Sequence, residues 1–385
     1  MSIPSLASRL PQVGTTVFTQ MSQLALEHGA VNLGQGFPDF ACDPRLVELV
    51  GEAMRAGHNQ YAPMTGVPAL REAIAAKIEA TYGRRYDPAA EITVTVGASQ
   101  AIQSAILAVV HPGDEVIVIE PAYDCYAPAV VLSGGVVVPV AMRIDDAGYG
   151  VPWDDVRAAV TPRTRMIVVN TPHNPTGTIL RRRDLDALAS IVEGSQILVL
   201  SDEVYEHMVY EGEPHASVSR HPMLAERAFV VSSFGKAFHV TGWKIGHVAA
   251  PAALTEQFRK VHQYNVFSVA TPMQHAIAAY LQDPAPWRDL PAFYQAKRDL
   301  FRAGLAASRF TLLPSDGTYF QCVRYDAVSD LSEVDFARWL TSEVKVAAIP
   351  VSVFYSQPTE SKVVRFCFAK KDETLRLALE RLARL

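Results

Sequence analysis

A lysine at position 236 lies in the segment SSFGKAFHVTGWKIG (232–246), among small and aromatic residues. A buried lysine holds its proton less tightly, so its amine becomes a nucleophile toward an aldehyde. Ser233 and Lys244 flank it, and a hydroxyl with a second cation can hold a dianionic phosphate. A single lysine alone is more typical of a solvated surface charge. Two lysines and a serine in this order favour the chemical interpretation.

Two further polar motifs follow predicted strands. Asp202, in DEVY (202–205), can keep a proton on a heteroaromatic nitrogen, and Tyr205 offers a phenol nearby. The alternative is a helix N-cap followed by a core tyrosine. Asn174, in NTPHNPTG (170–177), is fixed by neighbouring prolines and can donate to a ring oxygen or a carboxylate. A simple Asn-Pro turn is its alternative.

Two motifs suggest anion binding. GASQ (97–100) is a strand–glycine–helix junction, where free amides and the helix dipole attract a phosphate. It has no Walker lysine, so a small phosphate monoester suits it better than a nucleoside triphosphate. Arg365 lies in the apolar run VVRFCFAKK (363–371). A buried guanidinium requires an anion, which is either a substrate carboxylate or a structural ion-pair partner.

Together these groups match one cofactor. Pyridoxal 5'-phosphate has an aldehyde for Lys236, a phosphate, a protonatable ring nitrogen and a ring oxygen. Asp202 would keep the ring nitrogen protonated, so that the ring can act as an electron sink. Lys236 would act as the general base at the substrate Cα. Tyr123, in EPAYDCY (120–126), could stack on the ring or simply pack in the core.

Val/Ile-rich runs alternate with helix-like segments through the middle of the chain. They do not alternate apolar with polar residues, which is typical of strands covered on both faces. Strand–helix–strand repetition predicts an α/β fold with a mainly parallel sheet and ligands beyond the carboxyl ends of the strands. Strands are expected at 91–96, 114–120, 135–142, 165–170, 196–203 and 228–234, and helices at 99–110 and 184–194.

The two ends of the chain differ from its middle. After about residue 285 the pattern changes to longer amphipathic helices and shorter strands. The last helix-like segment (372–385) places leucines 375, 379, 382 and 385 near one face. We therefore expect a large domain of residues 46–284, and a small domain built from 1–45 and 285–385 that closes over it.

Composition narrows the class of protein. The 385 residues carry a formal net charge of −5, which argues against the basic face that nucleic acids and membrane surfaces require. The four cysteines form no CxxC pair, so we expect no metal site, no disulfide scaffold and a cytoplasmic location. No signal peptide is visible. Residues 125–142 are uncharged, but prolines and glycines interrupt them, so a short helix, a turn and a strand are expected instead of a membrane span.

The order of the motifs resembles that in class I aminotransferases of pyridoxal-phosphate fold type I. NPTG, DEVY, SSFGKxxxxxGWKxG and a late RFCF arginine carry this resemblance over nearly the whole chain. VNLGQGFPDF, NQYAPMTG and EPAYDCY are similar to the kynurenine/glutamine transaminase branch, and TTVFTQMS, VHQY and FCFAKK to bacterial methionine aminotransferases. The resemblance implies a mainly parallel seven-stranded sheet in the large domain and a smaller α+β domain.

The resemblance also implies the roles of individual residues. Lys236 would be the Schiff-base lysine, with Asp202 on the pyridine nitrogen. The other residues implied to bind the cofactor are Asn174 and Tyr205 on the ring oxygen, Tyr123 against the ring, and Ser233, Lys244, Ala98 and Ser99 on the phosphate. Lysine stands at 244 where many class I enzymes have arginine. Tyr61 would reach the phosphate of a neighbouring subunit, which implies a homodimer with shared active sites.

For the substrate, the resemblance implies an α-carboxylate held by Arg365, Asn174 and the Gly36 backbone, with Phe18 and Phe37 lining the side-chain pocket. We expect transfer of the amino group of methionine, or of an aromatic or other apolar amino acid, to a 2-oxo acid by a ping-pong route. The alternative is a kynurenine/glutamine transaminase with cysteine-S-conjugate β-lyase activity. A regulator that only senses its ligand would carry a DNA-binding segment, and no basic helix-turn-helix precedes the fold in the sequence.

Overall fold

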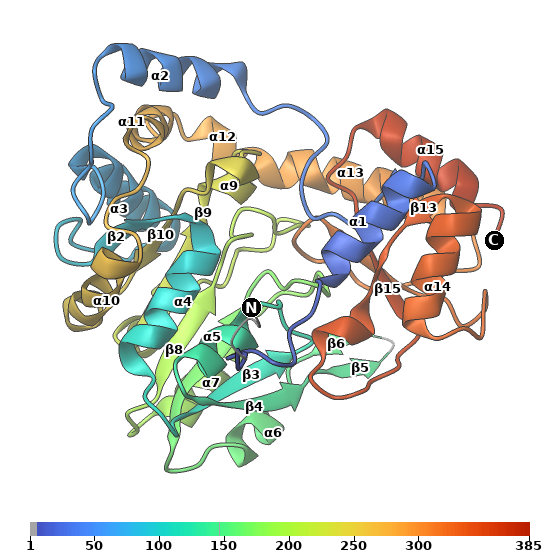
Figure 1. The fold of residues 1–385 in the computed structure, drawn as a ribbon, viewed down its shortest axis with the longest axis horizontal. Coiled ribbons are helices and arrows are strands. Elements are labelled where there is room, and N and C mark those ends of the chain that lie inside the picture. Colours follow the sequence, from blue (N-terminus) through green and yellow to red (C-terminus); the bar gives the residue numbers. More distant parts are fainter. Residues whose placement is uncertain (1–5, 146) are drawn as a thin grey trace, which may run out of the picture.

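A seven-stranded sheet forms the centre of the molecule (Figure 1). The computed structural model describes residues 6–145 and 147–385. The strands of the sheet are β2 (Ile92–Thr95), β3 (Glu115–Glu120), β4 (Val136–Ala141), β7 (Thr164–Asn170), β8 (Leu198–Asp202), β9 (Ala228–Ser233) and β10 (Gly246–Ala249). Their order is β2-β10-β9-β8-β7-β3-β4. Only β10 is antiparallel to its neighbours in this sheet, so the predicted α/β fold with a mainly parallel sheet is confirmed.

Helices cover both faces of this sheet, because successive side chains of a strand point to opposite sides. Val116 and Val118 of β3 pack with one set of helices, and Ile117 and Ile119 with the other. The first set is α4 (Gly97–Val109), α5 (Tyr126–Leu132) and α10 (Ala252–Asn265), and the second is α6 (Trp153–Ala158), α7 (Arg182–Val192) and α8 (Pro222–Ala225). Burial on both faces explains why the strand sequences are continuously apolar.

Smaller elements complete this part of the chain. A third core cluster lies around β2 and packs against α2 (Pro44–Arg55), α3 (Pro68–Tyr82), α9 (Phe234–Ala237) and α11 (Thr271–Tyr280). The remaining pieces are β5 (Arg143–Asp145), β6 (Gly148–Gly150), η1 (Val218–Arg220) and η2 (Thr241–Trp243). The uncharged stretch at 125–142 forms α5, a turn at Gly134 with φ +81° and β4, as expected. Within the described ranges, no helix has the length and apolar character needed to cross a membrane.

The last third of the chain forms a second, four-stranded sheet in the order β11-β12-β15-β14. Its strands are β11 (Thr311–Leu312), β12 (Phe320–Arg324), β14 (Ile349–Pro350) and β15 (Val363–Cys367). The helices in this region are α12 (Ala285–Arg288), α13 (Leu290–Leu305), α14 (Glu333–Trp339), η3 (Leu340–Val344), η4 (Val351–Phe354) and α15 (Asp372–Leu382). α13, α14, α15 and β15 lie together on the right-hand side of the molecule, whereas α12 lies nearer the middle (Figure 1).

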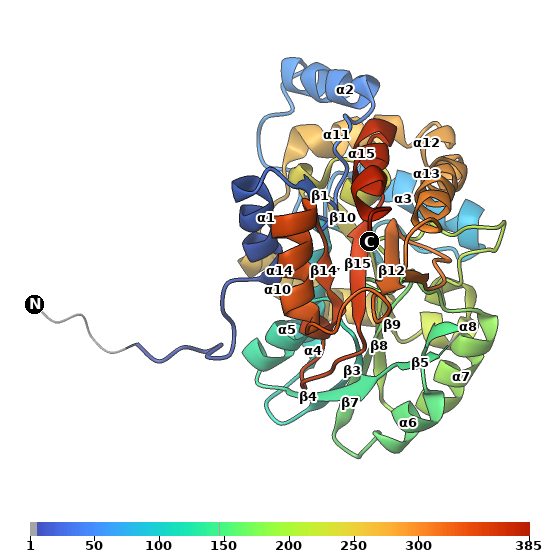
Figure 2. The same ribbon diagram turned by 90° about the vertical axis from the view of Figure 1, so that its right-hand side faces the viewer.

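The segment at residues 17–32 also packs in this region. β1 (Val31–Asn32) pairs in parallel with β13 (Val346–Ala347). Met21 of α1 (Val17–Glu27) shares a cluster with Ala337 of α14, and the side view shows α1 beside α14 (Figure 2). The division at residues 46 and 285 stays a prediction.

Leu375 tests the packing of the last helix. Its side chain is fully buried, so Leu375→Ala should lower the free energy of unfolding by about 2–5 kcal/mol. Leu377, two residues along the same helix and 43% exposed, is the matched control, and its replacement by alanine should change that free energy by less than about 0.5 kcal/mol. Urea unfolding followed by circular dichroism measures both. Equal losses in the two variants would contradict the assigned helix face.

Candidate active site

Three neighbouring parallel strands end at the same level and bring polar groups together. Asn170 of β7 pairs with Asp202 of β8, and Asp202 with Val231 of β9. The Asn170 amide donates to the backbone carbonyl of Asp202 at 2.8 Å, and its Oδ1 accepts the backbone N–H of Asn174 at 2.8 Å. Asn170 therefore fixes both the end of β8 and the NPTG turn, a role that sequence reasoning missed.

A cavity of about 310 Å³ opens at this edge of the sheet. All but one of the residues predicted for the site line it, namely Phe18, Gly36, Phe37, Ala98, Ser99, Tyr123, Asn174, Asp202, Tyr205, Ser233, Lys236, Lys244 and Arg365. The exception is Tyr61, which is 81% exposed and packs edge-on against Phe267. Its contact with a second subunit stays a prediction.

Lys236 lies in α9, directly after β9, and its amine is held inside the molecule. Its Nζ donates to the Gly36 carbonyl at 3.1 Å and to the Tyr319 hydroxyl at 3.1 Å. No carboxylate of residues 6–145 and 147–385 forms an ion pair with it. Burial lowers the pKa of this amine to about 8. The neutral, nucleophilic form is therefore far more populated near neutral pH than for an exposed lysine.

Asp202 is 3% exposed, and its carboxylate has one strong donor. The Tyr126 hydroxyl donates to Oδ2 at 2.6 Å. Burial raises the pKa of Asp202 to about 6, while the Tyr126 hydrogen bond acts in the opposite direction. No helix begins within residues 203–217, so Asp202 does not act as a helix N-cap. Such a carboxylate is suited to a cationic partner inside the cavity.

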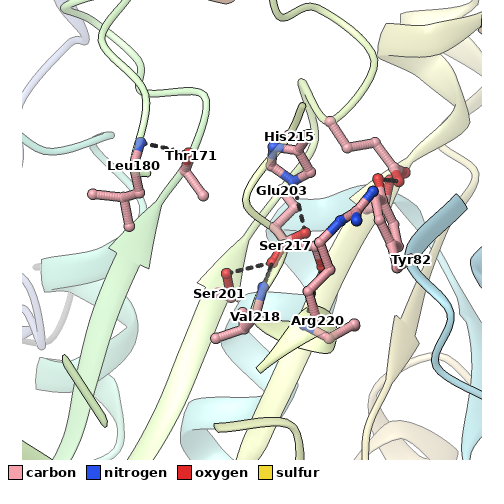
Figure 3. A network of polar contacts seen from close by, with 12 residues as sticks. Tyr82, Thr171, Leu180, Ser201, Glu203, His215, Ser217, Val218 and Arg220 are labelled. Atoms are coloured by element: carbon pink, nitrogen blue, oxygen red, sulfur yellow. Dashed lines mark hydrogen bonds and ion pairs between the residues drawn. The ribbon is translucent and has the colours of Figure 1, made fainter. Parts of the chain in front are cut away.

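Glu203, the residue after Asp202, forms a network of hydrogen bonds at the end of this strand (Figure 3). Glu203 is 1% exposed and does not line the cavity. Its Oε1 accepts from the Ser201 hydroxyl at 2.8 Å and the Val218 backbone N–H at 3.0 Å, and Oε2 lies 2.9 Å from His215 Nε2. These bonds fix the turn from which Asp202 and Tyr205 project.

One end of the cavity is built for an anion. Gly97, at the start of the 13-residue helix α4, has φ +68°, and an added Cβ there would lie 3.5 Å from Lys244 Nζ. The Lys244 amine is therefore next to the helix N-terminus, and no described carboxylate pairs with it. Ser99 and Ser233 line the same cavity. A cation, hydroxyls and free backbone amides together fit a phosphate.

Arg365 of β15 supplies a second anion site. It is 1% exposed, and its guanidinium lies 3.9 Å from the centre of the Phe320 ring. Its Nη1 donates to Asn174 Oδ1 at 2.6 Å and its Nη2 to the Gly34 carbonyl at 3.0 Å. Nε has no partner, and no carboxylate of the described chain pairs with the group. The structural ion pair considered from sequence is therefore not formed, and the buried cation is available to a ligand carboxylate.

Several residues that matter here were not found from sequence. Tyr126, Asn170, Tyr319 and Phe320 contact predicted site residues, and Gln35 and Thr241 line the cavity. Tyr126 lies in the motif EPAYDCY, of which only Tyr123 was predicted to contact the cofactor. For Tyr319, the sequence carries no local signal, because its partner Lys236 is 83 residues away.

Comparison with known proteins identifies the family. Residues 29–382 match the family model described as aminotransferase class I and II. The methionine aminotransferase of Escherichia coli K12 is 52% identical over 98% of both chains. A crystal structure of an Escherichia coli protein with that function superimposes with a TM-score of 0.97 at 51% identity, covering 100% of each chain. A probable N-succinyldiaminopimelate aminotransferase of Mycobacterium tuberculosis is 42% identical over 98% of this chain and 97% of its own. Kynurenine–oxoglutarate transaminase 3 of Rattus norvegicus is 35% identical over 97% of this chain and 89% of its own.

Tyr126→Phe should raise the pKa of Asp202 further, because the lost hydrogen bond favours the charged carboxylate. The increase should be about one pH unit. The folded-state pKa lies above the ordinary value of 3.8, so the stability that Asp202 contributes is full below pH 3.8 and is lost as the pH rises through the folded pKa. Urea unfolding of the cofactor-free protein across this range should show the loss ending about one unit higher in the variant.

Asp202→Asn is the control for this measurement. It has no group to titrate at this position, so it should abolish this part of the pH dependence, with or without the Tyr126 substitution. Superimposable curves for the wild type and Tyr126→Phe would show that the phenol does not act on the carboxylate.

Proposed function

The chain belongs to the class I and II aminotransferases, which in this fold are pyridoxal 5'-phosphate enzymes acting on amino acids and 2-oxo acids, and we propose that its amino donor is methionine. Aromatic and other apolar amino acids would be further donors, and the amino group would pass to a 2-oxo acid by a ping-pong route. The observation that carries the proposal is the cavity itself. It combines a lysine amine, a buried carboxylate and two separate cationic anion sites.

The side-chain end of the cavity supports an apolar donor. The cations that line the cavity are Lys236, Lys244 and Arg365, and each has a place in the proposal already. Phe18, Phe37 and Phe320 also line the cavity, and the rings of Phe18 and Phe320 lie 5.5 and 3.9 Å from the Arg365 guanidinium. A thioether or an aromatic ring packs well there, whereas a second carboxylate would find no cation.

The residues that would hold the cofactor follow from the contacts above. Lys236 would attach it covalently. Lys244, Ser233 and the start of α4 at Ala98 and Ser99 would bind its phosphate. Asp202 would face the ring nitrogen, Asn174 and Tyr205 the ring oxygen, and Tyr123 the ring itself. When bound, pyridoxal phosphate supplies an electron sink for the charge that develops at the substrate Cα.

The chain's own groups would do the rest of the work. Arg365, with Asn174 and Gly36, would bind the substrate carboxylate and so present the Cα hydrogen to Lys236. The Lys236 Nζ, once free, would accept that proton and return it. An amine with a pKa of about 8 is well suited to both directions near neutral pH.

We further propose a homodimer in the cytoplasm. Tyr61, Tyr264 and Phe267 are 81%, 87% and 53% exposed, and Tyr61 and Phe267 are in contact. Exposed aromatic groups of this kind are typical of an interface and would allow Tyr61 to reach the phosphate of a second copy. The four cysteines are free thiols, which suits a reducing compartment.

Lys236 can be tested directly. Borohydride reduction of the holoenzyme followed by peptide mapping should find the pyridoxyl mass on Lys236. Lys236→Ala should lower kcat by about a thousandfold or more, because it removes both the attachment point and the base. Lys244→Ala should keep the mass at Lys236 but bind the cofactor more weakly. An active enzyme without the pyridoxyl mass on Lys236 would contradict the proposed attachment of the cofactor to this lysine.

A panel of amino donors with one 2-oxo acid acceptor tests the substrate. Methionine, phenylalanine and tyrosine should give the highest kcat/KM. Aspartate and N-succinyl-diaminopimelate should be at least about 100-fold poorer, because burying an unpaired carboxylate costs about 3 kcal/mol or more. Kynurenine and glutamine test the alternative suggested by the kynurenine transaminase relatives. If methionine were among the poorest donors, the proposal that it is the amino donor would be wrong.

A further inference from the structure

We propose that the Tyr319 hydroxyl and the Gly36 carbonyl form a resting dock for the Lys236 amine, and that this dock couples the amine to the substrate-binding loop. The inference rests on the proposed function, in which Lys236 alternates between a bound and a free state. Tyr319 would thus be a positioning residue that does not line the cavity itself.

In the dock, the Lys236 amine donates to two acceptors, a backbone carbonyl and a hydroxyl. Lys236 Nζ lies 3.1 Å from the Gly36 carbonyl oxygen and 3.1 Å from the Tyr319 hydroxyl. The Tyr319 hydroxyl also donates to the Gly36 carbonyl. Its single proton is therefore used, and only its lone pairs face Lys236. The three groups form a closed triangle of hydrogen bonds.

Tyr319 is held rigidly in this position. It is fully buried, and its ring packs against Tyr205 at 5.1 Å, Phe320 at 4.9 Å and Tyr294 at 5.6 Å between ring centres. Tyr205 is the phenol assigned to the ring oxygen of the cofactor. The dock is therefore in direct contact with the phenol proposed to bind the cofactor.

The dock also involves the loop that would bind the substrate carboxylate. Four successive carbonyls, from Gly34 to Phe37, accept hydrogen bonds from distant side chains. Arg365 donates to Gly34 at 3.0 Å, and Lys370 donates to Gln35 at 3.3 Å and to Phe37 at 2.7 Å. The Gly36 carbonyl accepts hydrogen bonds from the Lys236 amine and from the Tyr319 hydroxyl. When the amine leaves, the loop loses one cationic donor next to the Arg365 site.

A side chain at Gly36 would crowd this arrangement. An added Cβ would lie 3.0 Å from the Phe320 ring, the same ring that covers the Arg365 guanidinium. The loop, the arginine and the dock therefore share one packing unit. A change at the amine can reach the carboxylate site through contacts that already exist.

The experiment compares Tyr319→Phe with Tyr294→Phe in the full-length, cofactor-free protein. Tyr294 is the matched control, because it is equally buried, touches the Tyr319 ring and has a hydroxyl without a partner. The first readout is the rate at which added pyridoxal 5'-phosphate becomes attached, followed by absorbance as a function of pH. Attachment requires the neutral amine, so the midpoint of this profile reports the pKa of Lys236.

Tyr319→Phe removes an acceptor that favours the protonated amine, so the midpoint should fall by about one pH unit. The second readout is hydrogen exchange of residues 34–37, which should become several-fold faster. Tyr294→Phe should match the wild type in both. Lys236→Met, which cannot donate, should speed exchange of the loop as Tyr319→Phe does, and it guards against a folding defect in the latter.

Unchanged exchange and an unchanged midpoint in folded Tyr319→Phe would overturn the dock. So would faster loop exchange in Tyr319→Phe that Lys236→Met does not reproduce, since the amine would then be irrelevant. If the wild type takes up no pyridoxal phosphate, the proposed function fails, while the exchange measurement still decides on the dock.

Discussion

The parallel register of β7, β8 and β9 is the constraint on which the site depends. Side chains alternate along a strand, so a slip of one residue would exchange Asp202 for Glu203 at the cavity. The bonds from Asn170 to the carbonyl of Asp202, and from Ser201, His215 and Val218 to Glu203, oppose such a slip. Of the two neighbouring carboxylates, Asp202 therefore lines the cavity, and Glu203 is bound within the fold.

The same region concentrates charge without neutralising it. Asp202, Lys236 and Arg365 are each enclosed, and none has a protein ion-pair partner in the described chain. Burying such groups costs free energy, which the apolar clusters on both sheet faces must offset. These charged groups therefore lower the stability of this edge of the sheet, and their charges face the cavity without a protein counter-charge.

Much of this could be predicted from local sequence. The Val/Ile runs gave the strands because burial on both faces leaves a continuous apolar pattern, and the polar motifs that follow those runs met at one edge because parallel strands end there. Residues such as Tyr126 and Tyr319 could not be found this way. Tyr126 meets Asp202 across 76 positions, and Tyr319 meets Gly36 across 283, so only the packed tertiary structure brings them together. The antiparallel strand β10 was also missed, because its four residues, GHVA, include only one β-branched residue, whereas all four residues of β2, ITVT, are β-branched.

The pairing of the early loop with the end of the chain has a consequence for biosynthesis. Gly34 and Phe37 are fixed by Arg365 and Lys370, 331 and 333 positions later. A nascent polypeptide leaving the ribosome can assemble its central sheet, which ends at Ala249, well before either donor has been translated. The loop at residues 34–37 is consequently the last part of the cavity to be completed during synthesis, because its distant hydrogen-bond donors are translated near the end.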